Sequence, residues 1–154
     1  MGRPATDKLY LEDLEVGQRF TTGTLTMTEA EIKAFAGRYD PQPFHLDDAA
    51  ARETLFGGLA ASGWHTAAAT MRLLVEDGPP FAWGIMGGGG EIAWPRPTRA
   101  GDVLHVEGEV TEIIPSKSKP DRGMVLLRSE TRNQNGDTVQ VTNMKLVVPR
   151  RDPV

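Results

Sequence analysis

The chain has 154 residues, of which 39% are hydrophobic, and a net charge of −4, so it can form one domain with its own core. No basic run marks a nucleic-acid surface, and the absence of cysteine excludes disulfides, thiolate metal ligands and a cysteine nucleophile. No apolar segment resembles a signal peptide or could span a bilayer. We therefore expect a cytoplasmic protein that binds neither membranes nor nucleic acids. The opening MGRPAT fits the loose myristoylation pattern at Gly2 and Thr6, which is short enough to match by chance.

The first part of the chain predicts a strand and then helices. Residues 17–28 are rich in threonine and partly alternate, which favours a strand. Thr28 then opens a capping box, and the helix it begins should end before Pro41, because proline disfavours helical backbone at the residue before it. A short helix over 46–54, capped by Asp47, should follow.

A longer helix is predicted from residue 63 to the prolines at 79 and 80. Its apolar residues recur at spacings of three and four, which is typical of a helix face buried against a sheet. The residues of this predicted face are Trp64, Ala67, Ala68, Met71, Leu74 and Val75.

The second half predicts three strands joined by short connections. Residues 102–114, 124–132 and 137–148 are rich in valine and alternate in part, as strands do. Asn135-Gly136 between the last two is a strong hairpin signal. Strand, helices and consecutive strands in this order favour an antiparallel α+β fold that wraps one apolar helix.

The segment RYDPQPFHLDDAA, residues 38–50, combines an acid, two prolines and a histidine. Each proline restricts its own backbone and that of the preceding residue, which lowers the entropy lost in building a site. A bent, extended segment could bring Asp40 and His45 to one pocket, where one accepts a proton from water and the other hydrogen-bonds that water. The alternative is an ordinary turn in which Asp40 is a cap and His45 leads into the next helix.

Ser62 and Gly63 stand at the predicted start of the long helix. Free N–H groups and the positive end of the helix dipole lie there, and a glycine lets a ligand approach the backbone closely. Together these could form an oxyanion hole, although simple capping by Ser62 would explain the same residues. His65 is a rival base that we expect to be packed inside, and His105 alternates with apolar neighbours and is expected on the surface.

Two other features carry less chemistry. The glycine run at 87–90 is neither a P-loop nor a convincing dinucleotide fingerprint, so a flexible or closely packed loop is expected there. The three histidines have no metal-ligand spacing, and we expect no metal. The polar loop 115–123 is either solvated or contacts the phosphates of a carrier through its basic residues, which are Lys117, Lys119 and Arg122.

Taken together, these residues resemble the MaoC-like hydratase family, also called the R-specific enoyl-CoA hydratases. The family pattern of aspartate, any residue, asparagine, proline, any residue and histidine reads DPQPFH at 40–45. Gly63 matches the glycine at the start of the family's central helix, and WPRPTRAGD at 94–102 is similar to the segment that leads into a strand. The resemblance covers roughly Leu11 to Pro149. It implies that 1–154 is a single hot-dog domain, an antiparallel sheet wrapped around a long central helix.

The resemblance implies that Asp40 and His45 hold and activate one water molecule. That water would add reversibly to a trans-2-enoyl thioester of CoA or a carrier, giving a 3-hydroxyacyl thioester of R configuration. The N–H of Gly63 would bind the thioester carbonyl. No cofactor is implied beyond the carrier that the substrate itself bears.

Four further residues are expected to contact the substrate. Gln42 stands where the family has asparagine, and Ser62 where many members have histidine. Pro43 belongs to the same motif as Gln42. Trp64 is bulky beside the glycine, and it could narrow the acyl tunnel or belong to the core.

Two other functions remain open at this point. A hot-dog thioesterase would direct water at the carbonyl carbon, and a non-catalytic thioester-binding protein would need neither Asp40 nor His45. Hot-dog domains usually pair through their sheets, so the resemblance implies a homodimer or a higher homo-oligomer. The exposed edges of a single sheet favour the same conclusion.

Overall fold

The computed structural model describes residues 7–152, so the pattern at Gly2 and Thr6 lies outside the described residues. In chain order the elements are the 3₁₀ turn η1 (Leu11–Asp13), β1 (Arg19–Thr21), β2 (Leu25–Thr26), α1 (Glu29–Tyr39), α2 (Pro43–Leu46), α3 (Asp48–Arg52), α4 (Gly63–Asp77), β3 (Gly87–Ala93), β4 (Val103–Pro115), β5 (Arg122–Arg132) and β6 (Thr138–Pro149).

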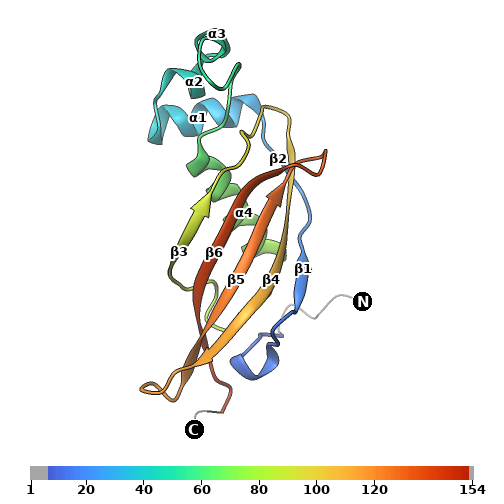
Figure 1. Cartoon of the computed structure of the whole chain (residues 1–154), viewed down its shortest axis with the longest axis vertical. Coiled ribbons are helices and arrows are strands. Elements are labelled where there is room, and N and C mark those ends of the chain that lie inside the picture. Colours follow the sequence, from blue (N-terminus) through green and yellow to red (C-terminus); the bar gives the residue numbers. More distant parts are fainter. Residues whose placement is uncertain (1–6, 153–154) are drawn as a thin grey trace.

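An antiparallel sheet runs along one side of the long helix α4, and α1, α2 and α3 gather beyond one end of the sheet (Figure 1). The strand order is β1-β4-β5-β6-β3, and β2 also pairs with β4. This arrangement confirms the predicted α+β fold with a sheet around one central helix. It also brings α1 to α3 close to the first turn of α4.

The three predicted C-terminal strands are confirmed as β4, β5 and β6. The Asn135-Gly136 signal lies in the hairpin between β5 and β6. Gly136 has a φ of 81°, and its N–H donates to the carbonyl of Asn133 at 3.0 Å. The turn needs the left-handed conformation that glycine adopts readily.

The strand predicted over 17–28 is divided into β1 and β2. Between them, the N–H of Gly23 donates to the carboxylate of Asp77 at the end of α4. The hydroxyl of Thr22 accepts from the N–H of Val106 at 2.9 Å. The strand is interrupted because the Asp77 carboxylate and the Thr22 hydroxyl accept hydrogen bonds here in place of the backbone carbonyls of a regular strand ladder.

The prediction of a loop at 87–90 is wrong, because these glycines begin β3, which pairs with β6. A Cβ at Gly90 would lie 2.3 Å from the carbonyl oxygen of Asn143, so the two backbones approach more closely than any side chain permits. The glycines obscure the alternation by which a strand is predicted.

The predicted buried face of α4 is wrong except at Leu74. Trp64 and Val75 are 59% and 66% exposed. The residues that α4 buries are His65, Thr66, Ala69, Thr70, Leu73 and Leu74. The residues of both faces recur at spacings of three and four, so periodicity alone does not show which face is buried.

Threonines can occupy the buried face of α4 because their hydroxyls are paired. Thr66 donates to Thr98 at 3.0 Å, and Thr70 lies 2.6 Å from Thr131, oxygen to oxygen. A buried hydroxyl with a partner avoids the cost of an unmet hydrogen bond. On the other side of α4, Trp64, Ala68 and Val75 are exposed, and Ala67 and Met71 are half-buried.

The hydrophobic core has two parts along the sheet. One lies under α1 and α4 and includes Ile32, Leu73 and Val106. The other lies under η1 and the chain after α4 and includes Phe81 and Val125. The first part anchors the helices that surround the start of α4.

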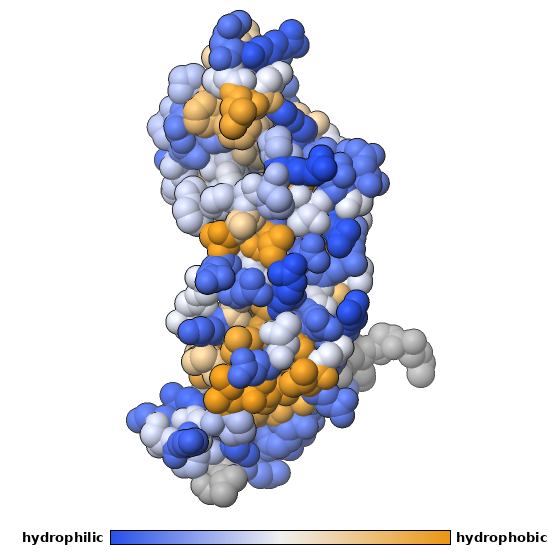
Figure 2. Space-filling model, viewed as in Figure 1, coloured by the Kyte–Doolittle hydropathy of each residue, from blue (hydrophilic) through white to orange (hydrophobic). Residues whose placement is uncertain are grey.

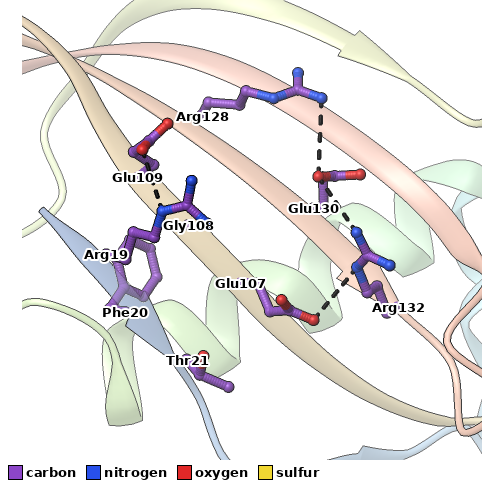
Figure 3. A pocket seen from close by; sticks show the side chains of 9 residues that line it. All are labelled: Arg19, Phe20, Thr21, Glu107, Gly108, Glu109, Arg128, Glu130 and Arg132. Atoms are coloured by element: carbon purple, nitrogen blue, oxygen red, sulfur yellow. Dashed lines mark hydrogen bonds and ion pairs between the residues drawn. The ribbon is translucent and has the colours of Figure 1, made fainter. Parts of the chain in front are cut away.

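The outer face of the sheet carries mainly charged side chains in its middle. Arg19 pairs with Glu109 at 3.2 Å and Arg132 with Glu107 at 3.3 Å (Figure 3). Apolar surface gathers lower on this face, towards the β4–β5 hairpin (Figure 2). There the register places Ile114, Met124 and Val147 side by side. Within residues 7–152, no helix is both long and apolar enough to cross a membrane.

Candidate active site

Asp40 caps the end of α1, and His45 lies in the next helix, α2. The N–H of Asp40 donates to the carbonyl of Ala36 at 2.8 Å and so closes α1. Gln42 is extended, but Pro43 begins α2, because proline is favoured at the first position of a helix. The predicted extended segment is therefore wrong beyond Gln42.

The short helix predicted within 46–54 is confirmed as α3, and the sequence did not predict α2, which comes directly before it. Asp47 caps α3 as predicted, and its carboxylate accepts from the N–H of Ala50 at 3.1 Å.

Asp40 and His45 face each other in a largely buried position. Oδ2 of Asp40 lies 3.3 Å from Nε2 of His45, and the side chains are 16% and 5% exposed. The other ring nitrogen, Nδ1, lies 2.7 Å from the carbonyl oxygen of Ala60. A carbonyl only accepts, so Nδ1 carries a hydrogen, and in the neutral ring Nε2 is left as an acceptor.

Two side chains donate to the Asp40 carboxylate. Gln42 donates to Oδ1 at 2.6 Å, and Ser62 donates to Oδ2 at 2.7 Å. Burial acts to raise the pKa of Asp40, but these hydrogen bonds, together with the positive charge that His45 carries when protonated, outweigh it and hold the pKa below its ordinary value. Asp40 is therefore an ionised acceptor at neutral pH.

Ser62 has two partners, so its removal should have two measurable effects. Its hydroxyl also accepts from the N–H of Trp64 at 3.2 Å, as the cap of α4. We expect Ser62→Ala to raise the pKa of Asp40 and to lower the free energy of unfolding by about 1 kcal/mol. A ¹³C NMR titration of the carboxyl groups and urea unfolding measure the two effects.

Thr28→Ala is the matched control, because Thr28 caps α1 through the N–H of Glu31 at 3.2 Å and makes no bond to Asp40. A folded-state pKa below the ordinary value stabilises the fold at neutral pH, and that stabilisation is lost as pH falls through the folded pKa. This acid-dependent loss should be smaller, and complete at a higher pH, in Ser62→Ala than in Thr28→Ala, because the folded pKa of Asp40 then lies closer to its unfolded value. An unchanged Asp40 titration in Ser62→Ala would contradict the assigned bond.

Gly63 is the first residue of α4, and none of the residues from 7 to 152 accepts a hydrogen bond from its N–H. The indole of Trp94 covers this glycine. A Cβ at Gly63 would lie 2.6 Å from Cε2 of Trp94. The position thus combines a free donor at the positive end of a helix with contact that only glycine permits.

A cavity of about 390 Å³ lies against both His45 and Gly63. Its wall also includes Thr66, Trp94 and Thr98. Four predicted substrate contacts do not line it, and these are Gln42, Pro43, Ser62 and Trp64. Gln42 and Ser62 act instead on Asp40, which stands behind His45.

The tryptophan that lines the cavity is Trp94, whereas the sequence suggested Trp64. The Trp94 indole N–H donates to the buried side chain of Gln140 at 3.0 Å. Trp64 packs edge-on against Trp94, with ring centroids 5.1 Å apart. The WPRP motif was visible in the sequence, but its position beside Gly63 depends on the pairing of β3 with β6.

The other two histidines and the basic residues of the β4–β5 loop lie away from the cavity. His65 is packed as predicted, with its ring stacked on Phe35 at 4.7 Å. Burial lowers the pKa of His65, partly opposed by the charge of Glu31. His105 lies on the outer face of the sheet beside Glu107. The basic residues of the β4–β5 loop do not line the cavity: Lys117, Lys119 and Arg122.

Arg99 is a structural support for the site that the sequence did not indicate. Its guanidinium donates to the carbonyls of Gly58 at 2.9 Å and Leu59 at 3.2 Å, and also to that of Phe56. These bonds hold the loop that presents the Ala60 carbonyl to His45. The partners are about 40 residues away in sequence, so no local pattern could identify them.

The chain matches the model of the MaoC like domain over residues 13–132 and belongs to this family. A MaoC-like dehydratase from Rhodospirillum rubrum is 61% identical, with a TM-score of 0.91 over 94% of this chain and 99% of that one. The R-hydratase PhaJ1 from Pseudomonas aeruginosa is 28% identical, with a TM-score of 0.71 over 96% of this chain and 89% of that one. The chain therefore has the hot-dog fold of MaoC-like dehydratases and R-hydratases.

A curated relative is the 3-hydroxybutyryl-CoA dehydratase of Methylorubrum extorquens. It is 33% identical over 120 residues, which are 75% of this chain and 73% of the relative.

Proposed function

We propose that this protein is a hydro-lyase that adds water reversibly to a trans-2-enoyl thioester of CoA or a carrier. One observation carries the proposal. His45 lines the same cavity as Gly63, whose N–H is free, and Asp40, which does not line the cavity, lies 3.3 Å from His45. A base near water and an electrophile for the carbonyl are the two parts that addition to the β-carbon needs.

The protonation of the pair suits it to hold one water molecule. In the neutral form of His45 that carries its hydrogen on Nδ1, Nε2 and Oδ2 of Asp40 are both acceptors, so a single water can donate one hydrogen to each. Its oxygen lone pairs then remain free to attack the substrate. The Ala60 carbonyl supports this arrangement, because it holds the His45 hydrogen on Nδ1.

In the proposed reaction the water oxygen bonds to C3 of the enoyl chain while one of its protons passes to His45. The electron pair of the double bond moves towards the thioester oxygen, where the Gly63 N–H stabilises the charge. C2 then takes a proton from the imidazolium as the carbonyl re-forms, and the pair returns to its first protonation state. Dehydration is the same path in reverse, and neither direction requires a metal or redox cofactor.

The first test is turnover of crotonyl-CoA, followed by loss of the conjugated enoyl absorbance. Crotonyl-CoA is chosen because the Methylorubrum relative is named for the corresponding C4 hydroxy thioester. Butyryl-CoA with a thiol reagent runs in parallel. Enoyl loss without thiol release supports the proposal, whereas thiol release from butyryl-CoA identifies a thioesterase. Binding without turnover on a broad enoyl panel would support a non-catalytic binding protein.

We further propose that the chain forms a homodimer through β3 and the exposed side of α4. All of β3 is exposed, and its outer edge has no strand partner among the described elements. A groove of about 380 Å³ between β3 and α4 is lined by Met71 and Ile92, among others. Free strand edges are normally covered, and a second copy would cover this one together with the apolar side of α4.

Ile92→Lys should therefore convert the protein from a dimer to a monomer, because a charge at the edge disfavours pairing. Light scattering measures the mass. Ile114→Lys is the matched control, since Ile92 and Ile114 are 37% and 44% exposed but Ile114 lies on the outer face near the β4–β5 hairpin. A wild-type monomer, or an Ile92→Lys protein of unchanged mass, would contradict the proposed interface.

A further inference from the structure

Arg96 is the one permanent charge among the side chains that line the cavity. The other lining residues are His45 and neutral groups. Arg96 is exposed and lies between Pro95 and Pro97. Proline fixes its own φ and restricts the residue before it, so the backbone that carries Arg96 is held in place at the mouth of the cavity.

Arg96 also differs from most arginines of the chain in its lack of a partner. Several others pair with carboxylates, as in Arg19–Glu109, Arg52–Asp48 and Arg72–Glu76. Arg99 is bonded to three backbone carbonyls. Between residues 7 and 152, no carboxylate or carbonyl pairs with the Arg96 guanidinium, so its five N–H donors are open to a ligand.

We propose that Arg96 binds an anionic group of the thioester substrate. The inference rests on the proposed function, which places the thioester carbonyl at Gly63 and C3 beside His45. The rest of the substrate then passes along the wall from Trp94 to Thr98, where the guanidinium lies. A planar guanidinium matches phosphate and carboxylate oxygens with two parallel hydrogen bonds.

Two parts of the substrate can supply this anion. One is the phosphates of the CoA or carrier arm, and the other is a carboxylate on the acyl group. Three saturated thioesters separate them. Butyryl-CoA has phosphates, S-glutaryl-N-acetylcysteamine has only an acyl carboxylate, and S-butyryl-N-acetylcysteamine has neither.

The experiment compares the Kd of these ligands, from NMR titration, for wild type, Arg96→Gln and Arg19→Gln. Arg19→Gln is the control because Arg19 lies on the outer face, paired with Glu109 (Figure 3), and does not line the cavity. We expect Arg96→Gln to weaken one anionic thioester about tenfold, as loss of a charge-assisted hydrogen bond does, and to leave the neutral thioester unchanged. Added salt should weaken that ligand more in wild type than in Arg96→Gln.

A selective loss for butyryl-CoA assigns Arg96 to the phosphates, and a selective loss for the glutaryl thioester assigns it to an acyl carboxylate. Unchanged binding of all three, equal weakening of all three, or no binding by wild type overturns the inference. The three ligands cannot be hydrated, so the result does not depend on turnover. If the protein hydrates crotonyl-CoA but binds all three ligands independently of Arg96, this inference is refuted and the proposed function stands. If Arg96→Gln weakens an anionic thioester but the protein does not hydrate crotonyl-CoA, the Arg96 site stands and the proposed function is refuted.

Discussion

Asp40→Asn and His45→Gln should each lower kcat for hydration of crotonyl-CoA about a hundredfold or more, the usual scale for a positioned acid–base group. Glutamine at 45 cannot take the proton from water. Asparagine at 40 removes the charge that helps to hold the water. Gln42 and Ser62 donate to different oxygens of the Asp40 carboxylate, and an asparagine amide has only one oxygen in place of these two. Steady-state kinetics measures both effects.

Because the two groups act on one water, the double variant should be little slower than the worse single variant. His105→Gln is the matched control, since His105 also lies near a carboxylate, at 2.9 Å from Glu107, but on the outer face. It should retain wild-type kinetics. Activity within a few-fold of wild type in both Asp40→Asn and His45→Gln, with the fold intact by circular dichroism, would remove this mechanism.

Gly63→Ala should produce the second large loss, although it adds only a methyl group. The new Cβ would lie within 2.6 to 2.8 Å of three atoms of the Trp94 indole. Either the tryptophan or the first turn of α4 must move, and the free N–H moves with that turn. We expect kcat to fall about a hundredfold, as when an oxyanion donor is lost. Overpacking should also lower the free energy of unfolding by about 1–3 kcal/mol.

Gly37→Ala is the matched control, because Gly37 lies in α1 and its added Cβ would meet nothing within 4 Å. It should leave kcat unchanged. Adding Trp94→Ala to Gly63→Ala removes the obstructing ring and should recover part of the lost kcat. Wild-type kinetics in Gly63→Ala, or no recovery in the double variant despite a native fold, would count against the role of this contact.

The strongest sequence predictions are those that rest on local chemistry. Asp47 caps a helix where predicted, Ser62 caps α4, and Gly136 closes the last hairpin. Turns and caps depend on a few adjacent residues, so a single sequence is sufficient to indicate them. The alternating C-terminal runs are strands as predicted, because alternation is also a local pattern. The resemblance to MaoC-like hydratases agrees with the family to which the chain belongs.

The sequence predicted which residues form the candidate site, but only the tertiary structure shows how they are arranged. Asp40 and His45 were already conspicuous in the sequence, but the Ala60 carbonyl that sets the tautomer and the Ser62 hydroxyl that bonds to Asp40 come from later in the chain. Their proximity follows from the packing of α1 to α3 against the start of α4. The catalytic roles of these residues stay predictions until the variants are measured.

What the sequence by itself determined is the fold class, the caps and turns, and the residues from which a site could be made. Only the tertiary structure decided that α4 buries Thr66 and Thr70 in place of Trp64, that the glycine run is strand β3, and that Trp94 covers Gly63. Each of these depends on a partner distant in sequence, namely a hydroxyl, a neighbouring strand or an indole. Local patterns record the spacing of residues along the chain, and they do not record which distant group satisfies a hydrogen bond or fills a space.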